Sequence, residues 1–136
     1  MAMHPLDVVA VINTSPDTVD LLRTTLQRAG LVVVSGYTFD IREGRLDIEA
    51  FIRQHQPEVI VYDVAPPYDE NWRLFEHVRG LAAVQRCRFV ITSTNPAHLE
   101  RLAGRDERIY EVVGRPLDLD AIVTAVKEAV RARPTR

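Results

Sequence analysis

Short apolar runs alternate with segments of helical periodicity along the whole chain, and this alternation limits the folds that the sequence can form. Five runs are predicted to be buried strands: Val8–Ile12, Leu31–Val34, Val59–Asp63, Arg88–Ser93 and Ile109–Val113. Continuous apolar runs of this length are typical of strands that are covered on both faces. Strands in such an order pair in parallel through right-handed helical crossovers. The sequence therefore predicts an α/β fold, a three-layer α/β/α sandwich around a five-stranded parallel sheet.

Capping residues and apolar faces predict five helices between and after these strands. Helix starts are expected at Ser15–Pro16, Asp47 and Asn95–Pro96, and Asp118 is expected to cap the last helix. The remaining helix is marked by apolar residues at helical spacing from Trp72 to Leu81. Strands and helices are thus expected to alternate strictly.

Two segments interrupt this regular pattern. Two adjacent prolines predict that residues 65–69 form a loop. The stretch 35–46 is the least regular part of the chain, and its segment Tyr37–Leu46 contains Tyr37, Phe39 and Ile41. This segment is interpreted either as a loop that binds a partner or as one that packs over the sheet edge. The aromatic residues Trp72 and Phe75 are expected to belong to the core.

Length and composition indicate an ordinary globular protein. The 136 residues are predicted to form one domain, residues 1–136, with a core of about residues 7–131 and no output domain. A hydrophobic content of 46% and a net charge of −2 give no electrostatic case for nucleic acid or an anionic membrane surface as a partner. No apolar run is long enough to span a membrane, and the start of the chain lacks signal-peptide features. The single cysteine, Cys87, fits a reducing cytoplasm and is expected to be a buried, inert thiol.

Asp63 ends the third apolar run, and the end of the first run carries no acid. An Asp at the carboxyl end of a buried strand lies where open α/β sheets bind their ligands. Phosphoryl transfer to a carboxylate uses a divalent cation, and Mg²⁺ prefers several hard oxygen ligands. Here the first run is followed by Asn13 and Thr14, which offer neutral oxygens only. Mg²⁺ binding is therefore expected to be weak or absent, and no cofactor is predicted.

With this order of elements, the chain resembles the receiver domain of bacterial two-component response regulators over nearly its whole length. The residues that carry the resemblance stand at the family's functional positions: Asp63 at the phosphoacceptor, Ser93 at the switch Ser/Thr, Val112 at the switch aromatic, Arg115 at the conserved Lys, and Asn13 and Thr14 at the acidic pair. The resemblance implies a CheY-like, flavodoxin-like sheet with strand order 2-1-3-4-5.

Two further positions, both after the predicted strand Val59–Asp63, carry the resemblance as well. Pro67 and Asn71 lie where receivers usually have proline and glycine, and Asn tolerates left-handed backbone geometry better than most residues. The resemblance also implies a cis peptide bond between Arg115 and Pro116.

The departures from the family pattern predict a degenerate receiver, or pseudo-receiver. Arg115 can form a bidentate salt bridge with Asp63 and replace the missing cation, although it can also reflect a general preference for Arg over Lys in this chain. Val112 removes the aromatic side chain that couples the switch Ser/Thr to the partner surface. Ser93 has a simpler interpretation as well, because small polar residues at strand ends often satisfy backbone groups. The usual switching relay is therefore expected to be broken at both ends.

The leading hypothesis is a stand-alone, receiver-like signalling module of bacterial two-component or phosphorelay signal transduction that acts through protein–protein contact. It is not expected to be an enzyme beyond self-phosphorylation or dephosphorylation at Asp63. The resemblance implies a histidine kinase or another signalling protein as partner, and a possible homodimer, through the fourth helix, the fifth strand and the last helix, including Ala121–Val130. Two alternatives stay open: a conventional receiver phosphorylated at Asp63, and a flavodoxin-like binder of a small molecule between the first and third strands.

Overall fold

The computed structural model describes residues 7–104, 108–114 and 118–131 of the chain, and its side-chain description omits Ala103 and residues 110–114. The elements follow one another as β1 (Val8–Asn13), α1 (Pro16–Arg28), β2 (Val32–Tyr37), α2 (Thr38–Arg42), α3 (Ile48–His55), β3 (Val59–Asp63), α4 (Tyr68–Arg79), the 3-10 helix η1 (Ala82–Val84), β4 (Arg88–Ser93), α5 (Pro96–Ala103), β5 (Ile109–Gly114) and α6 (Leu119–Arg131). The strands form one parallel sheet in the order β2-β1-β3-β4-β5. The predicted parallel α/β class is therefore confirmed.

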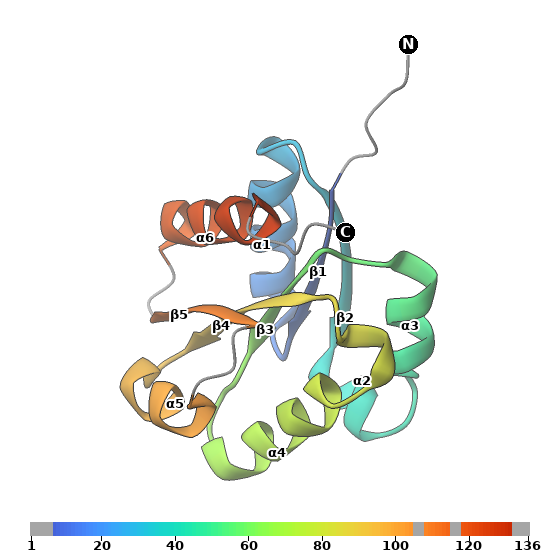
Figure 1. Cartoon of the computed structure of the whole chain (residues 1–136), viewed down its shortest axis with the longest axis vertical. Helices are drawn as coiled ribbons and strands as arrows, with labels where there is room; N and C mark the ends of the chain where they lie inside the picture. Colours follow the sequence, from blue (N-terminus) through green and yellow to red (C-terminus); the bar gives the residue numbers. More distant parts are fainter. Residues whose placement is uncertain (1–6, 105–107, 115–117, 132–136) are drawn as a thin grey trace.

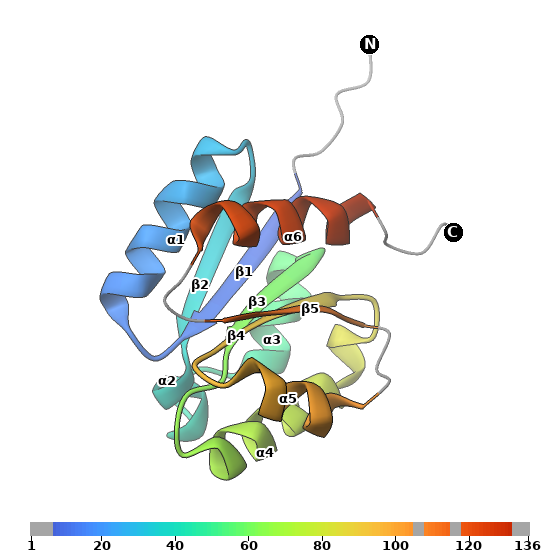
Figure 2. The same cartoon turned by 90° about the vertical axis from the view of Figure 1, so that its left-hand side faces the viewer.

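Helices cover both faces of the sheet, as the continuous apolar strands predicted. Because side chains alternate along a strand, Val9 and Val11 of β1 face one layer while Ala10 and Ile12 face the other. The first layer consists of α1 and α6, and the second contains α3, α4 and α5 (Figures 1 and 2). All four of these β1 side chains are fully buried. The hydrophobic core thus lies on the two faces of the sheet, which leaves the strand ends for a functional site.

The predicted helix starts are confirmed by their capping hydrogen bonds. Ser15 Oγ accepts a hydrogen bond from the backbone N–H of the third residue after it at 3.3 Å, and Asp47, Asn95 and Asp118 cap α3, α5 and α6 in the same way. Each cap satisfies one of the backbone N–H groups that a helix leaves without a partner. Local sequence therefore determined where these helices begin.

Three details differ from the sequence-based expectation. Residues 38–42 form the short helix α2, so the predicted strict alternation with five helices was wrong: two helices separate β2 from β3. Strand β2 continues to Tyr37, beyond the predicted end at Val34. Helix α4 begins at Tyr68 within the predicted loop, because Pro67 occupies the N-cap position, where its missing N–H costs nothing. The same helix ends at Arg79, before Leu81.

The segment Tyr37–Leu46 packs over the edge of the sheet formed by β2. A Cβ atom on Gly36 would lie 2.7 Å from Leu46 Cδ2, so the absence of a side chain at Gly36 allows the close approach of Leu46. Thr38, the first residue of α2, is buried, whereas Phe39 is 41% exposed and stacks on Tyr37. The segment therefore belongs to the folded body of the protein while presenting one aromatic ring to solvent.

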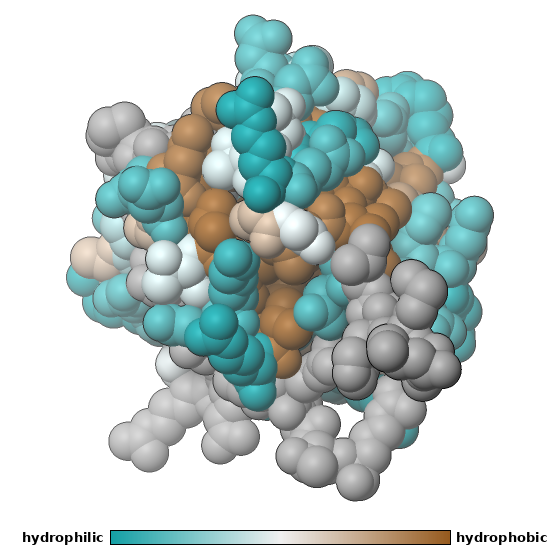
Figure 3. Space-filling view, turned by 90° about the horizontal axis from the view of Figure 1, so that it is seen from above, coloured by the Kyte–Doolittle hydropathy of each residue, from teal (hydrophilic) through white to brown (hydrophobic). Residues whose placement is uncertain are grey.

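The large hydrophobic residues exposed at the surface are spread over four elements. Among the described residues they are Leu21 on α1, Val32 on β2, Phe39 on α2 and Leu102 on α5. Single exposed residues of this kind are normal for a folded protein. On the face seen in Figure 3, hydrophobic residues are likewise interspersed with hydrophilic ones. None of the described helices is both long enough and apolar enough to cross a membrane.

Candidate functional site at the carboxyl edge of the sheet

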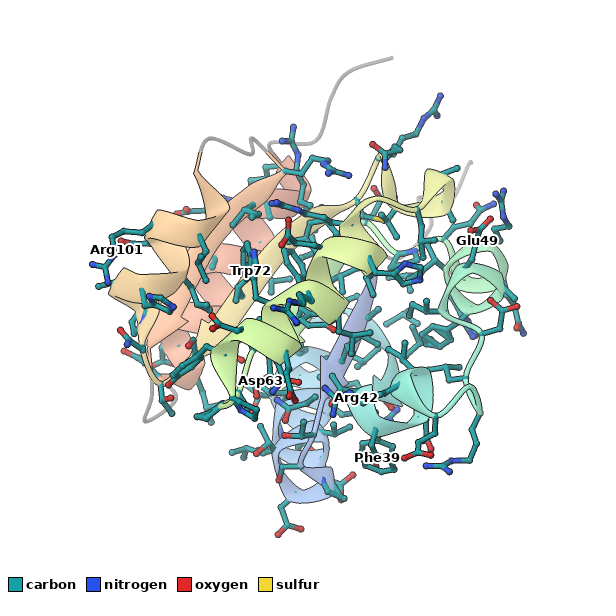
Figure 4. The ribbon with its side chains drawn as sticks, turned by 90° about the horizontal axis from the view of Figure 1, so that it is seen from below. Phe39, Arg42, Glu49, Asp63, Trp72 and Arg101 are labelled. Carbon is teal, nitrogen blue, oxygen red and sulfur yellow. The ribbon has the colours of Figure 1, made fainter. Side chains whose placement is uncertain are left out.

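Asp63 lies at the carboxyl end of β3, the central strand of the sheet, between β1 and β4. Its residue exposure is only 2%. The next residue, Val64, donates its backbone N–H to the carbonyl oxygen of Thr92 at 2.9 Å, which continues the ladder between β3 and β4. Figure 4 views the molecule from the side of α4, and Asp63 is labelled just below that helix in the picture. Asp63 therefore lies at the carboxyl edge of the sheet, as predicted from the sequence, but it is buried.

Thr92 forms a side-chain hydrogen bond with Asp63. Its hydroxyl Oγ1 donates a hydrogen bond of 2.6 Å to Asp63 Oδ1, and Thr92 is fully buried. The two residues are direct partners in the parallel ladder of β3 and β4. Thr92 was not predicted from the sequence, where the functional hydroxyl of this strand end was expected at the neighbouring Ser93. A shift of one residue reverses the side of the sheet that a side chain faces, so only the strand register could have distinguished the two.

Ser93 is buried, and its hydroxyl has a local partner. Ser93 Oγ accepts a hydrogen bond from the backbone N–H of Asn95 at 3.0 Å. This contact stabilises the turn between β4 and α5, where Asn95 in turn caps the helix. The arrangement matches the simpler interpretation of Ser93 as a residue that satisfies backbone groups at a strand end.

Asn13 occupies the end of β1, beside the end of β3. Ile12 pairs with Tyr62, so Asn13 and Asp63 are the next residues of the two adjoining strands. Asn13 is 1% exposed, and its Oδ1 accepts a hydrogen bond from the backbone N–H of Ser15 at 3.0 Å. Thr14 is exposed. The amide oxygen of Asn13 is thus already used to build the turn that leads into α1.

The acidic residues of the surrounding loops do not complete a metal site. Asp17, Asp69 and Glu70 are all exposed. Among the residues that the structure describes, no group of three or more His, Cys, Asp or Glu side chains is arranged to hold a metal ion. In the described part of the chain, Asp63 thus does not belong to a group of three or more such side chains.

Two predicted site residues cannot be compared with the structure. Arg115 and its peptide bond to Pro116 lie outside the described residues, and the cis peptide bond that the structure records is Pro66–Pro67. The backbone of Val112 is described, and it pairs with Ile91 of β4, but its side chain lies outside the description. The predicted roles of Arg115 and Val112 stay predictions.

Asn71 and Arg42 form a contact that the sequence analysis missed. Asn71 lies inside helix α4 with no positive φ, so the tolerance of Asn for left-handed geometry is not used there. Its side chain instead accepts a hydrogen bond from Arg42 of α2 and donates one of 2.6 Å to the carbonyl oxygen of Ala65. The contact joins residues 29 positions apart, and no local sequence signal predicts it.

A second contact links the two loops at this edge. Tyr68, the first residue of α4, forms a hydrogen bond between its hydroxyl and that of Thr94 in the turn after β4. The ring of Tyr68 also meets the ring of His98 on α5 edge to face, with centroids 6.0 Å apart. The first turn of α4 is therefore in contact with the turn after β4 and with helix α5.

Burial shifts the pKa values of two groups in the core. Desolvation raises the pKa of Tyr62 well above its ordinary value; the positive charge of Arg42 opposes this rise, and the charge of Asp63 adds to it. Burial, with a smaller contribution from Glu58, raises the pKa of the Cys87 thiol to about 11. Cys87 is 3% exposed, and its Sγ donates to the carbonyl oxygen of Pro57 at 3.3 Å. The expected buried thiol is confirmed, as is the core position of Trp72.

Solved structures with the same fold are response regulators and related signalling proteins. A sensor protein from Polaromonas sp. JS666 matches with a TM-score of 0.72 and 15% identity over 93% of this chain and 98% of its own. The chemotaxis response regulator CheY4 of Vibrio cholerae matches with a TM-score of 0.71 and 18% identity over 92% of this chain and 99% of its own. A response regulator receiver domain protein from Clostridium thermocellum gives a TM-score of 0.70 and 13% identity over 93% and 95% of the two chains.

Comparison of sequences alone does not detect this likeness, because no protein-family model and no curated protein matches the chain. The structural likeness nevertheless extends over more than nine-tenths of each chain. This protein therefore has the flavodoxin-like α/β fold of response regulator receiver domains.

Proposed function

We propose that the protein is a receiver-like signalling module that acts through contact with another signalling protein, with little or no Mg²⁺-dependent phosphorylation of Asp63. The observation that carries this proposal is the environment of Asp63. Its carboxyl group is buried and bonded to Thr92, and the end of the adjoining strand carries Asn13 in place of an acid.

The chemistry of phosphoryl transfer supports this view. A phosphoryl group that moves to a carboxylate carries charge on its equatorial oxygens, and a divalent cation normally neutralises that charge. Mg²⁺ is bound mainly by hard, charged oxygens in near-octahedral geometry. Asn13 supplies a neutral oxygen that already accepts the N–H of Ser15, and Thr14 supplies an exposed hydroxyl. Each missing carboxylate removes on the order of 1–4 kcal/mol of attraction for the cation.

In this proposal Asp63 has a structural role. The hydrogen bond between Thr92 and Asp63 joins the ends of β3 and β4, and this edge contacts α5 through Tyr68 and His98. A guanidinium from Arg115 is the proposed cation of the site, in agreement with the resemblance at that position. A fixed edge of this kind holds the module in one conformation, which is the state that a partner recognises.

The proposed partner surface consists of α5, β5 and α6, including Ala121–Val130. Strand β5 is at the edge of the sheet, and α5 and α6 flank it on opposite faces. Leu102 of α5 is 37% exposed at this side of the molecule. Histidine kinases or other signalling proteins are the proposed partners, and a second copy of the chain can use the same surface.

Calorimetric titration with Mg²⁺ tests the proposal. We expect no saturable binding at millimolar Mg²⁺, either in the wild-type protein or in the Asp63→Asn variant, because the described site offers no acidic set of ligands. Saturable binding to the wild-type protein that disappears in Asp63→Asn would support the alternative, a conventional receiver phosphorylated at Asp63.

A further inference from the structure

Helix α2 is connected to the loop that follows Asp63 by two consecutive side-chain hydrogen bonds. Arg42, the last residue of α2, donates to Asn71 Oδ1, and Asn71 Nδ2 donates to the carbonyl oxygen of Ala65 at 2.6 Å. Ala65 follows Asp63 by two positions. Figure 4 shows Arg42 and Asp63 at the same edge of the molecule. The short helix outside the sheet and the loop of the candidate site therefore share one side chain, that of Asn71.

Helix α2 has little stability of its own. It contains five residues, and its N-cap residue, Tyr37, makes no side-chain capping bond. A helix this short does not persist in water without tertiary contacts, because the cost of nucleation exceeds the gain of so few hydrogen bonds. The side chains that attach α2 to the rest of the fold include Ile41, which packs against the core, and Arg42, which donates to Asn71. Segments with few stabilising contacts are the ones that open locally in folded proteins.

The docked position of α2 also leaves polar groups unsatisfied. Thr38 Oγ1, at the first residue of α2, is buried and has no hydrogen-bond partner among the described residues. Tyr62 Oη, one residue before Asp63 and within the electrostatic reach of Arg42, is in the same condition. A buried hydroxyl without a partner loses the hydrogen bonds that it would form with water. Movement of α2 away from the edge would let water reach Thr38. The free-energy cost of burying this hydroxyl without a partner therefore opposes the docked state.

We propose that α2 is a strap that keeps the loop between β3 and α4 in place beside Asp63: Arg42 holds Asn71, Asn71 holds Ala65, and release of α2 frees the loop. The strap is a conformational device that goes beyond the proposed signalling role. It does not depend on whether Asp63 accepts a phosphoryl group.

Thermodynamic coupling distinguishes a strap from two unrelated local contacts. If α2 and the loop stabilise each other, weakening either one must loosen the other to the same extent. If Asn71 only caps Ala65, its removal loosens the loop and leaves α2 unchanged. The decisive readout is therefore the mobility of the segment that was not mutated.

Hydrogen exchange followed by mass spectrometry on the full chain provides that readout. Segment 38–46 reports on α2, and segment 64–75 reports on the loop and the first turns of α4. In Arg42→Ala we expect amides of 64–75 to exchange roughly tenfold faster than in the wild type, as expected for the loss of one charge-assisted hydrogen bond. In Asn71→Ala we expect a similar acceleration in 38–46. The double variant should exchange no faster than Asn71→Ala, which already removes both hydrogen bonds.

Arg45→Ala is the matched control. Arg45 lies in the same segment and forms an exposed ion pair with Asp40, with 59% of the Arg45 side chain exposed. Such pairs contribute little to stability, so 64–75 should exchange as in the wild type. Asn71→Asp separates the two bonds of the strap. Its carboxylate still accepts from Arg42 but no longer donates to Ala65, so 64–75 should exchange faster while 38–46 loosens less than in Asn71→Ala.

The result of Arg42→Ala decides the question even if the buried Asn71 variants fold poorly, because Arg42 is an exposed residue. Exchange in 64–75 within twofold of the wild type in Arg42→Ala would overturn the strap. So would unchanged exchange in 38–46 of a folded Asn71→Ala protein. Neither measurement uses Mg²⁺, a phosphoryl donor or a partner. A result that overturns the strap would therefore not count against the proposed signalling function.

Discussion

Thr92 and Asp63 are joined by a buried hydrogen bond of 2.6 Å between the ends of two neighbouring parallel strands. Both side chains are at least 98% buried. A bond in this position fixes the orientation of the Asp63 carboxyl group and holds the edge of the sheet together. The relationship gives Asp63 a structural task that needs neither a metal ion nor a phosphoryl group.

Removal of the Thr92 hydroxyl should destabilise the fold. In Thr92→Val the shape of the side chain is kept while the donor to Asp63 is lost, and a buried acceptor then loses one partner. We expect the free energy of unfolding to fall by about 1–3 kcal/mol. Urea denaturation measures this change. Thr92→Ser retains the hydroxyl and should lose clearly less stability; a Thr92→Val protein as stable as the wild type would show that the bond contributes nothing.

Two acids introduced at positions 13 and 14 should create a Mg²⁺ site. Asn13→Asp keeps an oxygen that can accept the N–H of Ser15, and Thr14 is exposed, so both changes fit the local structure. The combined Asn13→Asp/Thr14→Asp variant should bind Mg²⁺ at least roughly tenfold more tightly for each added charge. Without Mg²⁺ it should be less stable, because like charges then face Asp63.

Calorimetry and thermal denaturation with and without Mg²⁺ measure both effects. Thr124→Asp, which adds one charge to an exposed position of α6, is the control and should respond to Mg²⁺ as the wild type does. Failure of the double variant to bind Mg²⁺ would mean that more than the two acids has been lost from the site.

Stability should fall as the pH rises through the titration of Cys87. Burial raises the pKa of the thiol from 9.0 to about 11, so the folded state holds this proton more tightly than the unfolded state. The resulting stabilisation is fully present below about pH 9 and is lost by about pH 11, with a full extent on the order of 2 kcal/mol. Urea denaturation across this range should give a shallower decline for Cys87→Ala than for the wild type. Parallel declines would contradict the assigned pKa.

A side chain at Gly36 should disturb the packing of the 37–46 segment. The Cβ atom of Gly36→Ala would lie 2.7 Å from Leu46 Cδ2 and 3.4 Å from Ile12 Cδ1, so Leu46 has to move. We expect a loss of about 1–3 kcal/mol in the free energy of unfolding. In Gly36→Ala/Leu46→Ala the clash is removed, and the loss should be smaller than the sum of the single changes.

The matched control for this pair is Gly80→Ala, whose Cβ would meet its nearest atom at 3.4 Å, with no side chain in the way. It should have little effect on thermal stability. An additive result for the Gly36 and Leu46 changes would show that the close approach carries no energetic consequence.

The general architecture could be predicted because each local signal agreed with the global fold. The five apolar runs required cover on both faces, and Ser15, Asp47, Asn95 and Asp118 marked the helix starts that the structure contains. Helix α2 escaped notice because its five residues carry no cap and no helical repeat, and its stability comes from tertiary contacts.

The candidate site could be predicted only in part. Asp63 and Asn13 were located correctly because strand ends follow from the apolar pattern. The partner of Asp63 was not, since choosing Thr92 over Ser93 requires the register between β3 and β4. Asn71 was assigned by its position in a family pattern, yet it lies in a helix and acts through its side chain. Contacts between distant segments, such as Arg42 with Asn71, leave no trace in local sequence.

The most direct test of the structural role of Asp63 is the intact mass of the protein after incubation with acetyl phosphate and millimolar Mg²⁺. The predicted result is no gain of a phosphoryl group, because the buried carboxyl group is bonded to Thr92 and has no acidic pair beside it to bind the cation. A gain of one phosphoryl group in the wild type that is absent in Asp63→Asn would contradict the account and restore a conventional receiver.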